Sequence, residues 1–133
     1  MFKIKKRKIS IKNKPFIIAE MSGNHNGSLD NALKIVDLAA IAGADAIKLQ
    51  TYKPDTITMQ SPRKEFFIKD KGNIWKNNSL FSLYKKAQTP WEWHKKIFDR
   101  AKKKNIIYFS SPFDETAVDF LESLNVPLYK VAS

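Results

Sequence analysis

Short apolar runs alternate along this chain with stretches in which apolar residues recur every three or four positions. The runs at 16–20, 46–50, 106–111 and 128–132 contain apolar residues at both parities, which is typical of strands that are buried on both faces. The stretches between these runs predict helices over about 28–42, 80–87, 89–104 and 114–124. Strands that alternate with helices in this way indicate an α/β fold with a parallel sheet and right-handed crossovers.

The first residues depart from this pattern and predict a short β-hairpin. Phe2 and Ile4 share one parity and Ile9 and Ile11 share the other, while residues 5–8 between them are all basic. We therefore expect an N-terminal hairpin over residues 1–14, followed by an α/β unit over residues 15–133.

The number of predicted strands suggests half of a barrel. Four strands are half of a closed TIM (β/α)₈ barrel, which typically needs ~250 residues, and this chain has 133. The expected fold is the N-terminal half of such a barrel, with four parallel strands and truncated at Ser133. A flavodoxin-like sheet is the alternative, although those sheets usually finish with a covering helix. The long mixed segment 51–78 is an insertion of a kind that is often functional.

Several residues are expected to define helix ends. Ser28 and Asp114 are plausible N-caps, and Gly43 is suited to the position just after a helix. The segment 89–92, Thr-Pro-Trp-Glu, has the form of a capping box with proline in the first turn.

Composition and charge exclude some classes of protein. The chain contains no cysteine, so disulfides and thiolate catalysis are excluded and a cytoplasmic location is expected. It has no apolar stretch of ~20 residues, and its basic first residues lack the apolar core of a secretory signal. The net charge of +11 is compatible with nucleic-acid binding. However, the lysines occur in nearly every segment and no nucleic-acid motif is present, so we expect a solvated enzyme surface, with no nucleic-acid or membrane partner.

Polar residues stand where each predicted strand ends, and in a parallel barrel these ends share one rim. A buried lysine at such a rim is costly unless it meets an anion, so two lysines with hydroxyl groups predict a pocket for phosphate and carboxylate. Glu20 adds an acid for proton transfer or for holding sugar hydroxyls. Glu20 could instead form a purely structural ion pair with Lys48. The strand-end residues are Glu20, Lys48, Gln50, Ser110, Ser111, Lys130 and Ser133.

The two histidines give weaker signals. His25 lies in the loop after the first of the barrel strands, where a role in substrate binding is plausible. His94 lies in the first turns of a predicted helix, where a structural role is more common. Their spacing is not that of metal ligands, so no metal site is expected within these residues.

Four segments resemble, in order and spacing, the motifs of the sialic acid synthase family. They are residues 19–27 (AEMSGNHNG), 42–51 (AGADAIKLQT), 109–113 (FSSPF) and 127–133 (PLYKVAS). Within this family, residues 89–95 (TPWEWHK) and 116–121 (TAVDFL) look most like the pseudaminic acid branch. The N-acetylneuraminate branch, which uses a different sugar, is the alternative.

This resemblance implies an enzyme that forms a C–C bond between phosphoenolpyruvate and the open-chain aldehyde of an acetamido sugar, with release of phosphate. It implies that Lys48, Gln50, Ser111, Lys130 and Ser133 bind substrate together with Asn24, and that Glu20 faces the sugar or assists proton transfer. A divalent cation, manganese or magnesium, would polarise the aldehyde. Its ligands would lie on later strands, outside this chain, in a full-length enzyme that is expected to be a homodimer. The half barrel alone is predicted to be inactive.

Overall fold

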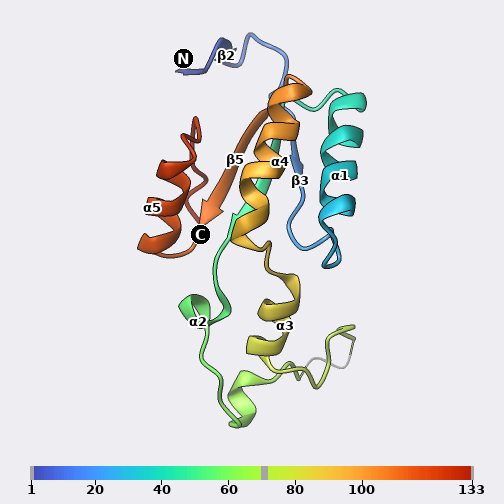
Figure 1. The fold of residues 1–133 in the computed structure, drawn as a ribbon, viewed down its shortest axis with the longest axis vertical. Coiled ribbons are helices and arrows are strands. Elements are labelled where there is room, and N and C mark those ends of the chain that lie inside the picture. Colours follow the sequence, from blue (N-terminus) through green and yellow to red (C-terminus); the bar gives the residue numbers. More distant parts are fainter. Residues whose placement is uncertain (1, 70–71, 133) are drawn as a thin grey trace.

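The computed structural model describes residues 2–69 and 72–132 and consists of a hairpin, a small parallel sheet and the helices that connect its strands (Figure 1). The elements in chain order are β1 Phe2–Ile4, β2 Arg7–Ile9, β3 Ile18–Glu20, α1 Leu29–Ile41, β4 Ala46–Thr51, α2 Pro54–Ile57, the 3₁₀ helix η1 Lys64–Phe66, α3 Leu80–Ala87, α4 Trp91–Lys103, β5 Ile107–Pro112 and α5 Glu115–Ser123. None of the helices within the described residues is long and apolar enough to cross a membrane.

The main sheet has the order β3–β4–β5, and both strand pairs are parallel. The register pairs Glu20 with Lys48 and Gln50 with Ser111. β1 and β2 form a separate antiparallel pair. The parallel β/α arrangement and the N-terminal hairpin that the sequence predicts are therefore both confirmed.

The fourth predicted strand is not confirmed as a strand. Within residues 128–132, Tyr129 forms one isolated parallel bridge with Ser110, and the amide of Lys130 donates to the Ser110 carbonyl at 3.1 Å. Val131 just beyond this bridge is 87% exposed. The segment thus approaches β5 in the expected direction but is held to it at a single point.

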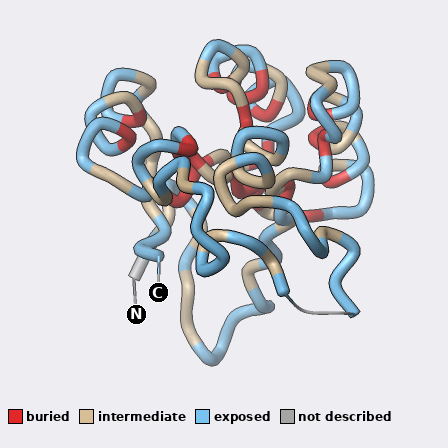
Figure 2. Tube along the Cα trace, turned by 90° about the horizontal axis from the view of Figure 1, so that it is seen from below, coloured by how far each residue is buried: buried red, intermediate tan, exposed pale blue. Residues whose placement is uncertain are grey.

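The three long helices lie along one side of the sheet. Viewed end-on, α1, α4 and α5 form an arc, with buried residues concentrated on the sides of the helices that face the strands (Figure 2). Ile47 and Leu49 of β4 project into this helix-covered core, where they pack with Val36 and Ile97. Because side chains alternate along a strand, Lys48 and Gln50 project to the opposite face.

The predicted N-caps are correct in two of three cases, and Gly43 follows the C-cap of α1 with a positive φ of 81°, as expected. The side chain of Ser28 accepts from the amide of Asn31 at the start of α1, and that of Asp114 accepts from Ala117 at the start of α5. The capping box predicted at Thr89 is wrong, because α4 has Pro90 at its N-cap and no side-chain cap. The hydroxyl of Thr89 instead forms a hydrogen bond with Nε2 of His25, at 3.2 Å.

The hairpin and the insertion lie at opposite ends of the sheet. β4 and β5 run away from the hairpin, and their carboxyl ends lead toward the part of the molecule formed by α2 and α3 (Figure 1). The segment between β4 and α4 is therefore on the same side as the strand ends that carry the predicted site residues.

Candidate functional site

The candidate site is built on the face of the sheet opposite the helices. Lys48 and Gln50 alternate with core residues along β4, and Ser111 lies beside Gln50 in register on β5. Glu20 is the register partner of Lys48 on β3. Four of the predicted residues are therefore adjacent at the carboxyl ends of three parallel strands.

Glu20 and Lys48 form an ion pair across these strands. Nζ of Lys48 lies 3.3 Å from Oε1 of Glu20. The two side chains differ in burial, since that of Lys48 is 8% exposed and that of Glu20 is 60% exposed. A buried ammonium group needs an anionic partner, and here the partner can still be reached by solvent. The structural ion pair weighed from the sequence is therefore present, and its carboxylate stays accessible.

The remaining predicted residues lie around this pair at different depths. Ser111 is buried, Gln50 is half-buried, and Lys130 and Asn24 are exposed. Lys130 lines a hollow together with Tyr129 and Phe113, and Lys48 is not among its lining residues. The convergence of both lysines on one cavity thus stays a prediction, and Ser133 lies outside the described residues.

His25 has a structural role in this molecule. Its ring is fully buried, its Nδ1 accepts from the amide of Gly27 at 3.1 Å, and its Nε2 therefore donates to the hydroxyl of Thr89. Burial lowers the pKa of His25, which favours this neutral form. The substrate role considered for His25 does not fit an imidazole with both nitrogens occupied. The ring instead fixes the loop after β3, which carries Asn24, against the segment that leads into α4.

A second buried network lies directly behind the candidate site. Thr51, Ser110 and His94 are each 0% exposed, and Oγ1 of Thr51 lies 2.8 Å from Nε2 of His94 and 2.6 Å from Oγ of Ser110. Burial lowers the pKa of His94 to about 4. The sequence places Ser110 among the rim residues, but its hydroxyl belongs to this network on the helix side of the sheet. Thr51 was missed, because its hydrogen-bond partners His94 and Ser110 lie 43 and 59 positions away in the sequence.

The described residues do not form a metal site. They contain no group of three histidine, cysteine, aspartate or glutamate side chains that could hold a metal ion. Both nitrogens of His25 and of His94 are already hydrogen-bonded. The residues described in this chain therefore do not fit the divalent cation that the resemblance implies, and a cation bound elsewhere in a full-length enzyme stays a prediction.

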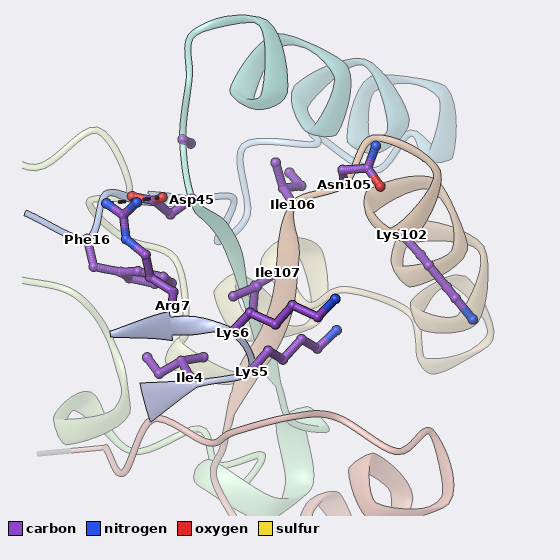
Figure 3. Close-up of a pocket in the computed structure, with 11 residues that line it drawn as sticks. Ile4, Lys5, Lys6, Arg7, Phe16, Asp45, Lys102, Asn105, Ile106 and Ile107 are labelled. Atoms are coloured by element: carbon purple, nitrogen blue, oxygen red, sulfur yellow. Dashed lines mark ion pairs between the residues drawn. The ribbon is translucent and has the colours of Figure 1, made fainter. Parts of the chain in front are cut away.

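Another hollow lies at the opposite end of the sheet, beneath the hairpin (Figure 3). Lys5, Lys6 and Lys102 contribute its positive charge, while Arg7 pairs with Asp45 at 3.6 Å. Asp45 also accepts from the amide of Ile17, so this ion pair attaches the hairpin to the amino ends of the strands. None of the predicted site residues that the structure describes lines this hollow. It lies at the end of the strands opposite to the one at which parallel barrels carry their active sites.

Comparison with known proteins gives one family. The sequence model of the NeuB family matches residues 35–133. The pseudaminic acid synthase of Campylobacter jejuni is 50% identical over 120 residues, covering 90% of this chain and 34% of that protein. The pseudaminic acid synthase of Helicobacter pylori is 45% identical over 119 residues, again covering 90% of this chain and 34% of the relative. The chain thus spans about a third of the length of these relatives.

A solved structure extends the similarity to the fold. The N-acetylneuraminic acid synthetase of Leptospira borgpetersenii superposes with a TM-score of 0.78 at 32% identity, covering 98% of this chain and 40% of that one. Nearly the whole chain is therefore similar in fold to part of a longer protein.

Proposed function

Because the chain belongs to the NeuB family, we propose that it forms part of a synthase that condenses phosphoenolpyruvate with the aldehyde of an acetamido sugar and releases phosphate. The similarity to two pseudaminic acid synthases, at 50% and 45% identity, carries this proposal and favours pseudaminic acid as the product. N-acetylneuraminate is the alternative product. We also propose that the enzyme is a cytoplasmic homodimer.

The proposed reaction forms one C–C bond and one C–O bond, and it breaks one C–O bond. C3 of phosphoenolpyruvate attacks the aldehyde carbon, whose oxygen takes up a proton to become a hydroxyl group. Water adds at C2 and loses one proton, which balances the proton taken up by the aldehyde oxygen. The C2–O bond to phosphate then breaks, and the C2 hydroxyl gives its proton to the departing phosphate as it becomes the ketone of the keto acid. Substrate and product groups at the site are thus a phosphate, a carboxylate and sugar hydroxyls, which require cations and hydrogen-bond donors.

The Glu20–Lys48 pair supports this chemistry most directly. Lys48 is a buried cation whose present partner is an accessible carboxylate 3.3 Å away. We propose that phosphoenolpyruvate takes the place of Glu20 as the anionic partner of Lys48. Displacement frees the carboxylate to accept a proton or to hold a sugar hydroxyl. In this proposal, Glu20 neutralises Lys48 when the site is empty. When phosphoenolpyruvate is bound, Glu20 accepts a proton or holds a sugar hydroxyl.

The other site residues are proposed to complete the substrate pocket. Ser111 and Ser133 would donate hydroxyl hydrogen bonds to phosphoenolpyruvate, and Lys130 would add a second positive charge for its phosphate or carboxylate. Gln50 and Asn24 would bind the polar groups of the substrates. The divalent cation is proposed to be held by residues outside this chain.

The test is a phosphate-release assay on the full-length gene product with manganese, phosphoenolpyruvate and an acetamido sugar. We expect release that requires both substrates. Lys48→Gln should lower kcat/KM by roughly a hundredfold or more, since it removes a preorganised charge from the site. Lys34→Gln, on an exposed position of α1, is the matched control and should leave the rate unchanged. Absence of phosphate release with every acetamido sugar would disprove the proposal.

The same assay separates the two branches of the family. The acetamido sugar precursor of pseudaminic acid is compared with that of N-acetylneuraminate, each with phosphoenolpyruvate. A kcat/KM at least about tenfold higher for the first sugar, a difference of ~1.4 kcal/mol in transition-state binding, is expected. A preference for the second would favour the alternative product.

A further inference from the structure

The buried residues Thr51, Ser110 and His94, here called the Thr51 network, join two strands to a helix behind the candidate site. Thr51 is the last residue of β4, Ser110 lies within β5, and His94 lies in the first turns of α4. All three side chains are fully buried. The ring of His94 is also packed edge-on against Phe98 and Phe120, which restricts its position.

The hydrogen bonds of this network have one consistent direction. The carbonyl of Pro90 can only accept, so Nδ1 of His94, 3.2 Å away, carries the ring proton. In the neutral ring Nε2 is then an acceptor, and the Thr51 hydroxyl donates to it at 2.8 Å. The oxygen of Thr51 accepts in turn from Ser110 at 2.6 Å. Each hydroxyl is therefore fixed in orientation, and each group has its partner.

The network is directly connected to the backbone that carries three candidate substrate ligands. Gln50 immediately precedes Thr51, and Ser111 immediately follows Ser110. The amide of Lys130 donates to the carbonyl of Ser110 at 3.1 Å, which is the bond that holds the segment after α5 to β5. A shift of Thr51 would therefore move the backbone of Gln50, and a shift of Ser110 would move that of Ser111 and Lys130. The hydrogen bond between the two hydroxyls couples these shifts.

We infer that the Thr51 network is a positioning device that sets the affinity of the site for phosphoenolpyruvate. This inference rests on the proposed function. The three side chains themselves face the helices, away from the substrate face, and act only through the strand ends. Because Gln50, Ser111 and Lys130 would contact the substrate from these strand ends, a relaxed strand end is expected to misalign their hydrogen bonds and so to weaken substrate binding measurably.

The test is Thr51→Val in the full-length gene product, which keeps the shape of the side chain and removes its hydroxyl. We expect the Kd for phosphoenolpyruvate to rise roughly tenfold, with a similar rise in its KM and a change in kcat of less than about threefold. Thr51→Ser retains the hydroxyl and should restore the Kd to within about twofold of the wild type. Ser110→Ala, which leaves the bond between Thr51 and His94 intact, should also raise the Kd and serves if Thr51→Val does not fold.

Asp37→Asn is the control for a general loss of stability. Asp37 of α1 pairs with Arg100 at 2.8 Å and with Lys104 at 3.4 Å, both at the carboxyl end of α4, whereas His94 lies in the first turns of that helix. Substitution of Asp37 should lower the melting temperature without changing the Kd. Wild-type affinity in the Thr51→Val and Ser110→Ala variants would overturn the positioning role alone. A wild-type protein that binds no phosphoenolpyruvate would overturn both this inference and the proposed function.

Discussion

Burial keeps the two imidazoles of this molecule neutral, and one of them should make its stability depend on pH. The pKa of His94 falls from 6.5 to about 4, first because burial disfavours the charged ring, with a smaller opposing effect from its backbone bonds and from Glu92. The unfolded chain therefore binds more protons than the folded one between these two values. The contribution of the neutral His94 ring to the free energy of unfolding is fully present above pH 6.5 and is lost as the pH falls toward 4.

At pH 4, the titration of His94 should lower the free energy of unfolding by about 3 kcal/mol relative to neutral pH. This decrease is measured from unfolding free energies of the full-length gene product between pH 7 and pH 4. The variant His94→Gln should be less stable at pH 7, because it loses the hydrogen bonds of the imidazole. Because glutamine does not titrate, the variant's free energy of unfolding should fall less steeply between pH 7 and pH 4 than that of the wild type. His25, whose pKa is also lowered by burial, contributes to both proteins and cancels in the comparison. Parallel pH profiles for wild type and variant would exclude this role of His94.

At the scale of elements, the start of α5 gives a direct measure of a predicted cap. Oδ1 of Asp114 accepts from the amide of Ala117 at 3.1 Å and from the hydroxyl of Thr116 at 2.5 Å. Asp114→Ala removes both bonds and should lower the free energy of unfolding by about 1 kcal/mol. The change is followed as a shift in the thermal midpoint. Asp119→Asn, exposed in the middle of α5, is the control, and an equal shift in both variants would contradict the capping role.

The helix N-caps also show which structural features the local sequence can predict and which it cannot. Ser28 and Asp114 cap as predicted because a side-chain oxygen can reach an amide only three residues ahead. Thr89 has the same chemistry, but its partner is His25, a residue 64 positions away. A tertiary hydrogen bond of this kind cannot be recognised from the local pattern. For the same reason, Thr51 was not identified, whereas its neighbours Lys48 and Gln50 were found from the strand pattern.

At the scale of the whole molecule, the sequence predicts the parallel sheet and hairpin but not the state of the last segment. Hydrophobic periodicity depends on side chains that are buried within this chain, and β4, between two strands, follows it closely. Residues 128–132 have β5 as their neighbour on one side and make a single bridge. The strand character of this segment depends on neighbours that the pattern does not specify, and the position of its predicted ligand Lys130 depends on the same neighbours.

Residues 1–133 expressed alone should associate and should show no synthase activity. β3 is an edge strand of the sheet, and unpaired edges present free N–H and C=O groups that invite association. Apolar side chains are exposed near both sides of the sheet, with Ile18 at 41% and Val131 at 87%. At ~25 cal/mol per Å² of apolar area left in water, a few such side chains amount to several kcal/mol, which is comparable with the ~5–15 kcal/mol stability of an ordinary domain.

Activity should be absent because the chain covers only 34% of the length of its synthase relatives, and the described residues do not form a metal site. The measurement combines light scattering over a range of protein concentrations with the phosphate-release assay in the presence of manganese, phosphoenolpyruvate and the acetamido sugar. We expect a mass that increases with concentration and no phosphate release above background. Ile18→Lys, which places a charge on the exposed edge strand, should reduce the association without restoring activity. A monodisperse monomer that releases phosphate at the rate of the full-length protein would show that residues 1–133 contain a complete site.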